Sequence, residues 1–312
     1  MSVLPPGWRR RRVALPLASA LLLALALVLP DFTLTRPVAQ LIVVLDVSQS
    51  MNTPDCRLDR APAALSRLAC VKDALSDALR AMPCGAKLAW GVFSGNQTIV
   101  LAAPVEICTH RGELLQTLAN LDWRINWDAG SRIGAALVSA MRVLPTVPRE
   151  TELVPGLVFI TDGHEAPPVS PGNRRRFDDY AGKVQGVIVG VGGDSLTPIP
   201  KYDMDGNYLG EWGPDDVPQM DMSGYRALSS VPGEKMAGED DATPSGTEHL
   251  SSLKEDYLQL LAGDAKLEYR RLTRSADMLE TLQAAPLRRP LPVDTNLRWI
   301  PALAAMILLL IA

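Results

Sequence analysis

The amino-acid sequence predicts an α/β fold in which helices cover both faces of an open, doubly wound, mostly parallel β-sheet. Continuous apolar runs of strand length recur at 41–46, 153–162 and 183–193, as expected for strands buried on both faces. Segments with apolar residues at helical spacing lie between these runs. Strands that alternate with helices along a chain favour parallel pairing, so this order predicts a Rossmann-like sheet.

The individual elements come in a regular order. The first strand, LIVVLD (41–46), is rich in β-branched residues. Two strands at 87–93 and 98–103 form a hairpin around SGNQ (94–97). After the strand at 183–193, an acidic insertion rich in Gly and Pro occupies 194–248, and its part 203–241 is expected to be solvated and mobile. The predicted helices are 61–82, 113–121, 133–144, 250–262 and 278–283, and the segment LEYRRL (267–272) has a weaker pattern.

The N-terminal segment differs from this central part, which is expected to span 36–287. GWRRRR (7–12) precedes an uncharged stretch at 13–30 that has the length of a membrane-spanning helix. The positive-inside rule places residues 1–12 in the cytoplasm and makes 13–30 a transmembrane signal anchor. A cleavable signal peptide is the alternative, and both interpretations export the central part of the chain.

The C-terminal segment 297–312 ends in WIPALAAMILLLIA, which is also uncharged. Fourteen such residues are fewer than the roughly 17 that a spanning helix needs. The segment is therefore predicted to be a second, short membrane segment, with a buried core helix as the alternative. Between this segment and the domain lie two arginines, Arg288 and Arg289, and three prolines, Pro286, Pro290 and Pro292.

Composition and missing motifs exclude several functions. A net charge of -4 lacks the basic character of a nucleic-acid-binding protein. The sequence contains neither a P-loop nor a G-x-S-x-G elbow, and the glycine-rich VGVGGD (189–194) leads into the insertion rather than a helix. The protein is therefore predicted not to be an enzyme.

The four cysteines suit an oxidising compartment. Cys84 and Cys108 lie nearly symmetrically about the hairpin turn, so the register would bring them within bridging distance. Two free, buried cysteines are the alternative. Cys56 and Cys70 would pair only by elimination.

Oxygen-bearing side chains gather at the predicted carboxyl edge of the sheet, where doubly wound folds bind their ligands. Asp46 and Asp162 each close a strand, Ser48 and Ser50 come after Asp46 at steps of two, and Ser131 begins a helix. Carboxylates and hydroxyls are hard donors, which predicts Mg²⁺, with Ca²⁺ or Mn²⁺ as alternatives. Such a site would leave a coordination position open for a carboxylate of a partner protein.

Two polar residues come shortly after Asp162. His164 and Glu165 are therefore expected on the rim of the metal site, where they either contact a partner or are merely exposed.

Three motifs together resemble the von Willebrand factor A (VWA) domain and its metal-ion-dependent adhesion site. They are D-x-S-x-S after an apolar strand, G-[ST]-x-I-G-A-A-L, and [FI]-[TS]-D-G, and the resemblance covers about 38–285. It implies a non-catalytic, metal-dependent protein-binding module. The five ligands of the family match Asp46, Ser48, Ser50, Ser131 and Asp162. Ser131 stands where the family more often has Thr, and it keeps the hydroxyl.

Two narrower resemblances concern bacterial, membrane-anchored members. TPIPKYDMDGNYLGEW (197–212) and SSLKEDYLQLLA (251–262) are similar to segments of the BatA and BatB kind. MPCGAKLAWGVFSG (82–95) and FITDGHEAPP (159–168) resemble the MxaL group of the methanol dehydrogenase gene cluster. This implies a domain on the periplasmic face of the inner membrane that assists assembly and calcium insertion of methanol dehydrogenase. The alternative is a structural subunit of a Bat-type membrane complex with other VWA proteins and a MoxR-type ATPase.

Overall fold

The structure is a computed structural model, and it describes residues 6–59, 63–128, 130–148, 154–166, 175–217 and 247–311. The chain forms two compact units. One consists of Ala39–Arg288, and the other combines Met1–Val38 with Arg289–Ala312.

The larger unit is built on the predicted sheet. Its strands lie in the order β11-β6-β5-β1-β2-β3, with β4 also beside β2. β1 is parallel to both β2 and β5, β5 to β6, and β6 to β11, whereas β3 and β4 run antiparallel to β2. The chain therefore winds outward from β1 in both directions, as in a doubly wound fold. The bounds are β1 (Phe32–Asp46), β2 (Lys87–Ser94), β3 (Gln97–Val100), β4 (Val105–Glu106), β5 (Gly156–Thr161), β6 (Gly186–Gly190) and β11 (Glu268–Arg271).

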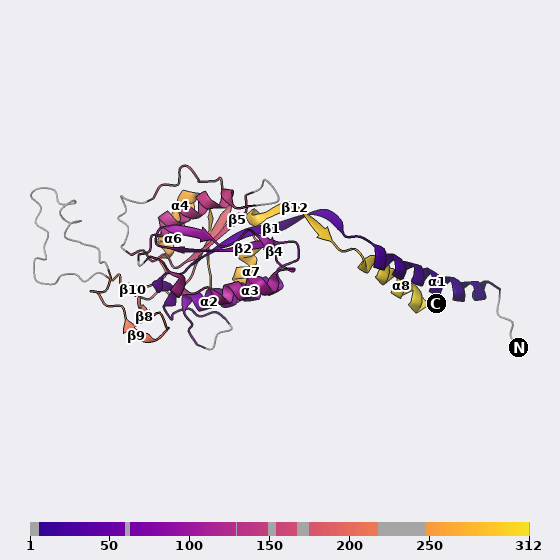
Figure 1. The fold of residues 1–312 in the computed structure, drawn as a ribbon, viewed down its shortest axis with the longest axis horizontal. Helices are drawn as coiled ribbons and strands as arrows, with labels where there is room; N and C mark the ends of the chain where they lie inside the picture. Colours follow the sequence, from indigo (N-terminus) through magenta and orange to yellow (C-terminus); the bar gives the residue numbers. More distant parts are fainter. Residues whose placement is uncertain are drawn as a thin grey trace, which may run out of the picture. The chain divides into compact units, whose positions relative to one another are not determined.

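Helices cover both faces of this sheet (Figure 1). On one face lie α2 (Arg67–Ala81), α3 (Arg111–Asn120) and α7 (Ser275–Leu282), and on the other α4 (Ile133–Val143) and α6 (Glu255–Ala265). β1 supplies both cores, because Val43 packs into the first and Val44 into the second. A strand covered on both faces has no polar face, which explains the continuous apolar run at 41–45.

Two helices begin later than their sequence pattern predicts. α2 begins at Arg67 rather than 61, because the Ser66 hydroxyl accepts the Ala69 N–H at 3.2 Å and caps the helix there. α6 begins at Glu255 rather than 250, because β10 (Leu250–Ser251) pairs with β7 (Thr197–Pro198). In both cases the residues ahead of the helix have other partners, which helical spacing alone does not reveal.

Part of the acidic insertion is folded. β8 (Pro200–Tyr202) and β9 (Tyr208–Glu211) form an antiparallel pair, and the Tyr202 ring stacks on Trp123 with centroids 5.9 Å apart. Within the segment expected to be solvated and mobile, residues 204–209 are exposed to solvent and β9 is a paired strand, and the remaining residues, 218–241, lie outside the described residues.

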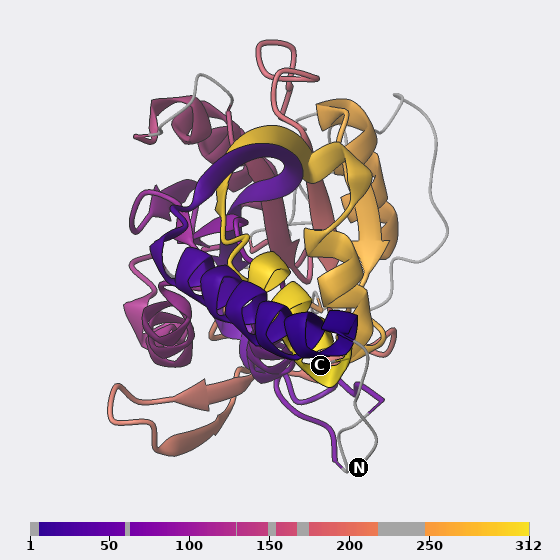
Figure 2. The same ribbon diagram turned by 90° about the vertical axis from the view of Figure 1, so that its right-hand side faces the viewer.

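The smaller unit contains the two ends of the chain. In it, α1 (Pro6–Val28) and α8 (Trp299–Ile311) lie side by side (Figures 1 and 2). They correspond to the membrane segments expected at 13–30 and 297–312. Among the described residues, no helix is long and apolar enough to cross a membrane.

A strand that the sequence pattern missed, β12 (Arg288–Thr295), pairs with β1 in this unit. Its Leu291 and Val293 are buried with Val38. Pro290 and Pro292 disfavour a strand assignment, yet proline is tolerated where a strand is paired on one side only.

Both disulfides are present, Cys84–Cys108 and Cys56–Cys70. The first closes the hairpin as its register predicts, since Lys87 of β2 lies opposite Glu106 of β4. The pairing of Cys56 with Cys70, open at the level of the sequence, fastens the loop after β1 to α2.

We predict that replacing both Cys84 and Cys108 by Ser lowers the free energy of unfolding by about 2–4 kcal/mol, because the bridge restricts the unfolded chain. Urea unfolding of the full 312-residue chain measures the loss. Identical unfolding midpoints for the variant and the unmodified protein would contradict it.

Candidate functional site

Two buried carboxylates lie at the carboxyl edge of the sheet. Asp46 ends β1 and Asp162 comes directly after β5, and neither side chain is exposed to solvent. Leu45 of β1 lies opposite Ile160 of β5 in a parallel pair, which brings the two strand ends to the same edge. The structure thus brings together the two acids singled out in the sequence.

Asp46 is held by neutral groups. Its Oδ2 accepts the Thr161 hydroxyl at 2.6 Å, and its Oδ1 accepts the Ser48 backbone N–H at 2.9 Å. Burial, and after it the charge of Asp162, raises the pKa of Asp46 to about 7. This carboxylate therefore lacks a positive partner in the described part of the protein, and a bound cation would supply one.

The loop after β1 presents its two serines together. Ser48 and Ser50 are buried, and their hydroxyl oxygens lie 3.1 Å apart. The loop continues as a short 3-10 turn at Gln49–Asn52, which keeps both hydroxyls on one side. Their spacing by two residues thus leads to convergence, as the sequence analysis expected.

Ser131 stands just before α4 and is fixed through its backbone. Its N–H and carbonyl both pair with Ala166, each at 3.0 Å. The Ser131 Oγ is buried and has no hydrogen-bond partner among the described residues. A buried hydroxyl without a partner costs about 1–3 kcal/mol, so its environment favours a ligand at this point.

Asp162 has a different environment from Asp46. Its Oδ1 accepts the His164 backbone N–H at 2.9 Å, and its Oδ2 accepts Arg67 Nη1 at 2.5 Å. Burial raises the pKa of Asp162, but the Arg67 guanidinium, His164 and the hydrogen bonds to the carboxylate together outweigh it and lower that pKa below the ordinary value. Asp162 therefore stays ionised without any other cation.

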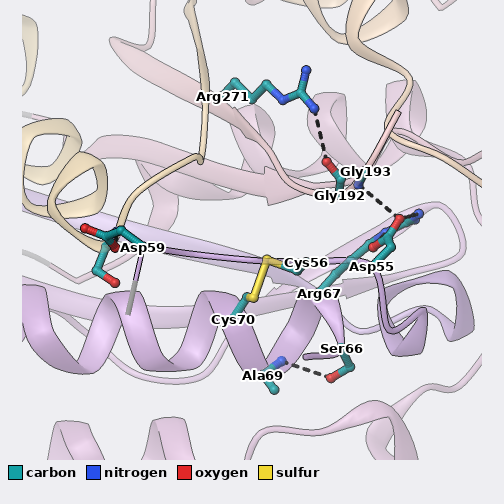
Figure 3. Close-up of a disulfide and its surroundings, with 11 residues drawn as sticks. Asp55, Cys56, Asp59, Ser66, Arg67, Ala69, Cys70, Gly192, Gly193 and Arg271 are labelled. Atoms are coloured by element: carbon teal, nitrogen blue, oxygen red, sulfur yellow. Dashed lines mark hydrogen bonds and ion pairs between the residues drawn. A yellow bond between two sulfur atoms is a disulfide. The ribbon is translucent and has the colours of Figure 1, made fainter. Parts of the chain in front are cut away.

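Arg67 is fully buried and was missed by the sequence analysis. Besides Asp162, it binds Asp55 through two parallel contacts, Nε–Oδ1 at 2.8 Å and Nη2–Oδ2 at 2.6 Å (Figure 3). The Asp55 carboxylate also accepts the Gly193 N–H at 3.0 Å. The Cys56–Cys70 bridge lies beside this pair, because Cys56 is the neighbour of Asp55 and Cys70 lies one helical turn after Arg67.

A glycine in the segment VGVGGD makes room for Arg67. Gly192 has φ +132, and a Cβ there would lie 2.7 Å from Arg67 Nε. The glycine run that superficially resembles a nucleotide loop is therefore explained by this close approach. One signal for this ion pair was present in the sequence. Cys56 is next to Asp55 and Cys70 is three residues after Arg67, so a Cys56–Cys70 bridge would bring Asp55 and Arg67 together.

The three serines line a single pocket of about 160 Å³. Across from them the pocket is lined by described parts of the insertion, namely Ile199, Trp212, Asp216, Val217 and Glu248. Described parts of the insertion thus contribute to the pocket together with the serines at the sheet edge.

The two residues expected on an exposed rim are both buried. His164 is 6% exposed and lines the pocket, and its Nδ1 has no partner among the described residues. Burial lowers the pKa of His164, although Asp162 opposes this. Glu165 instead supports α4, because its Oε1 accepts the Gly134 N–H at 3.1 Å and the Tyr257 hydroxyl at 2.5 Å.

This donor set suits a hard divalent cation. Three hydroxyls share one pocket, and Asp46 bonds to the N–H of Ser48 in the loop that carries two of them. Oxygen donors of this kind match Mg²⁺, Ca²⁺ or Mn²⁺. Such an ion would give the Ser131 hydroxyl, which has no partner among the described residues, an atom to bind.

We predict that Arg67→Met lowers the free energy of unfolding by about 3–5 kcal/mol, because two buried carboxylates lose their positive partner. Chemical denaturation measures the loss. Arg80→Met is the matched control on the same helix: its side chain is 60% exposed, and its pair with Asp77 should contribute less than about 1 kcal/mol. Equal losses in the two variants would contradict the prediction.

Comparison with known proteins concerns the domain that carries this site. Residues 41–164 match the profile of the von Willebrand factor type A domain. No curated protein is significantly similar to the chain. An aerotolerance-related membrane protein from Bacteroides fragilis NCTC 9343, solved with multiple mutations to serines, has a similar fold. It is 18% identical with a TM-score of 0.51, and the match covers 79% of this chain and 98% of that one.

A second solved structure, the conserved hypothetical protein BatB from Bacteroides thetaiotaomicron, is 19% identical with a TM-score of 0.50. The match covers 79% of this chain and 96% of that chain. At such low identities the two likenesses concern the fold. The profile match assigns a von Willebrand factor type A domain to residues 41–164, and the sheet topology agrees with that fold.

Proposed function

We propose that this domain is a non-catalytic protein-binding module that binds a divalent cation and, through it, an acidic side chain of a partner. In this proposal Ser48, Ser50 and Ser131 hold the ion together with Asp46 and Asp162. Mg²⁺ is the first choice, with Ca²⁺ and Mn²⁺ as alternatives. The observation that carries the proposal is the buried, unpartnered Ser131 hydroxyl in the pocket that Ser48 and Ser50 also line, unpartnered among the described residues.

Neutral hydroxyl ligands leave most of the charge of an ion uncompensated. Asp162 is already paired with Arg67, so its negative charge is partly neutralised within the protein. An ion in this pocket would therefore attract one more carboxylate. Of the two residues expected on the rim of the metal site, His164 lines the same pocket, and we propose that it contacts the partner.

We further propose that the protein associates with the bacterial inner membrane and that the domain lies in the periplasm. Large apolar side chains are exposed on both helices of the smaller unit, among them Leu21 and Leu27 of α1 and Leu310 of α8. Two disulfides suit the oxidising periplasm.

The proposed partner is a periplasmic protein under assembly. The resemblance to the MxaL group supports methanol dehydrogenase, with calcium insertion as the step assisted. A Bat-type complex with a MoxR-type ATPase is the alternative, and identifying the proteins that the chain captures distinguishes the two.

We predict that millimolar Mg²⁺ raises the unfolding temperature, because an ion that binds only the folded state at 100 times its Kd adds about 2.7 kcal/mol. EDTA should reverse the shift. Ser131→Ala should weaken Mg²⁺ binding by at least about tenfold.

Because the Ser131 hydroxyl is buried without a partner among the described residues, Ser131→Ala should keep or raise the metal-free stability, by up to about 1–3 kcal/mol. Ser139→Ala in α4, the helix that follows Ser131, is the matched control. The Ser139 hydroxyl accepts the Thr98 N–H at 3.1 Å, so this variant should lose stability and keep its response to Mg²⁺. An unchanged Mg²⁺ response in Ser131→Ala would exclude the site.

We also predict that the immobilised full chain captures methanol dehydrogenase subunits from periplasmic extract when Mg²⁺ or Ca²⁺ is present. EDTA or Asp46→Ala should abolish the capture, whereas Ser139→Ala should preserve it. Mass spectrometry identifies the bound proteins. Capture that is insensitive to EDTA would rule out the metal bridge, and capture of membrane proteins alone would favour the Bat-type alternative.

A further inference from the structure

The outer wall of the pocket belongs to the chain itself and is firmly built. Trp212 lies in this wall, with Lys201 Nζ 4.7 Å from the centroid of its ring. Lys201 also pairs with Asp216 at 3.1 Å, and the backbone N–H of Trp212 donates to the Ile199 carbonyl at 3.0 Å. The wall therefore has its own contacts, independent of anything bound in the pocket.

Two carboxylates line this wall, and their environments differ. Asp216 is satisfied, because its Oδ1 binds Lys201 and its Oδ2 accepts the Gly213 N–H at 3.0 Å. The Oε2 of Glu248, in contrast, is buried and has no hydrogen-bond partner among the described residues. The described residues that line the pocket include no Lys or Arg. A buried carboxylate oxygen without a donor or cation is costly, so this oxygen favours a positively charged ligand in the pocket.

The backbone around Glu248 is fastened to the proposed metal site. Glu248 lines the same pocket as His164, and its main chain contributes to the pKa of the His164 imidazole. Three residues later, the Ser251 hydroxyl accepts Arg67 Nη1 at 2.6 Å. Ser251 also pairs with Thr197 in β10–β7. None of these contacts uses the Glu248 carboxylate, so its position in the pocket does not depend on a bond made by that group.

We propose that Glu248 is an internal ligand of the metal site. Its carboxylate occupies the coordination position that an acidic side chain of a partner would take, and the partner binds only after Glu248 has left. This inference rests on the proposed function, since it requires a divalent cation in the pocket. In the resting protein the metal site is then closed. Only molecules in which Glu248 is displaced can bind a partner, so the apparent affinity falls in proportion to their fraction.

The experiment uses the full chain with Mn²⁺ as the probe ion and compares it with Glu248→Gln. Losing one anionic ligand should raise the Kd for Mn²⁺ by about tenfold. Water should enter the vacated position, so the proton relaxation enhancement per bound Mn²⁺ should increase. Acetate, a minimal carboxylate, should then reverse this increase at concentrations that leave the unmodified chain unaffected.

Two further variants define the cause. Asp216→Asn removes a carboxylate from the same pocket that is already bound to Lys201 and Gly213, so it should change neither the Kd nor the relaxation. Glu248→Asp keeps the charge but shortens the side chain, and it should give intermediate values. The metal-free unfolding temperature of each variant shows that the fold is intact.

The outcomes separate the two proposals. If Ser131→Ala weakens Mn²⁺ binding but Glu248→Gln leaves both the Kd and the relaxation unchanged, the internal ligand is refuted and the metal site stands. If the unmodified chain shows no saturable Mn²⁺ binding, the metal site itself is refuted, and the internal ligand with it.

Discussion

The ion pair between Arg67 and Asp162 determines how the elements around the pocket are arranged. Its atoms are 2.5 Å apart, and neither side chain is exposed. The same guanidinium binds Asp55 in the loop after β1 and Ser251 before α6, so it joins three segments to α2. A lysine could not replace it, because one ammonium cannot make the paired contacts with Asp55 while also reaching Asp162. Gly192 completes the arrangement by leaving space beside Nε.

This ion pair also gives the two acids at the sheet edge different electrostatic roles. Asp162 remains ionised, because burial raises its pKa by less than Arg67, His164 and the hydrogen bonds to the carboxylate together lower it. Asp46 receives only neutral donors from Thr161 and Ser48, and burial raises its pKa to about 7. One charge is therefore balanced by Arg67, whereas the other would be balanced by a cation bound in the pocket. A divalent cation beside three hydroxyls is a chemically consistent occupant.

The wall formed by the insertion affects how a partner can reach an ion in the pocket. An ion at an open sheet edge would be accessible to any acidic surface, whereas Ile199, Trp212 and Val217 place apolar groups over this one. Apolar surroundings strengthen the attraction between an ion and a carboxylate, because fewer water molecules screen it. They also require the wall, or a side chain in it, to move before a partner can enter. Glu248 is placed where it would couple that movement to ligand exchange.

Local sequence patterns were sufficient to predict much of this structure. The apolar run of β1 with Asp46 at its end, the serines spaced by two, and the hairpin that aligns Cys84 with Cys108 all depend on residues close in the chain. Periodicity and turn chemistry record such features directly. Sheet topology then results from the alternation of strands and helices. From these elements the sequence predicted the fold, the two acids at the strand ends and the three serines that line the pocket.

Other features arise from contacts between distant parts of the chain. Arg67 lies 95 residues from Asp162, and Glu248 reaches the pocket through an insertion whose composition suggested no structure. β12 carries prolines that mask its pairing with β1. A buried charge pair, a covering loop and an edge strand have no period of their own, since each is stabilised by a partner far away in sequence. These features therefore emerge only when the chain has folded and the partners have met.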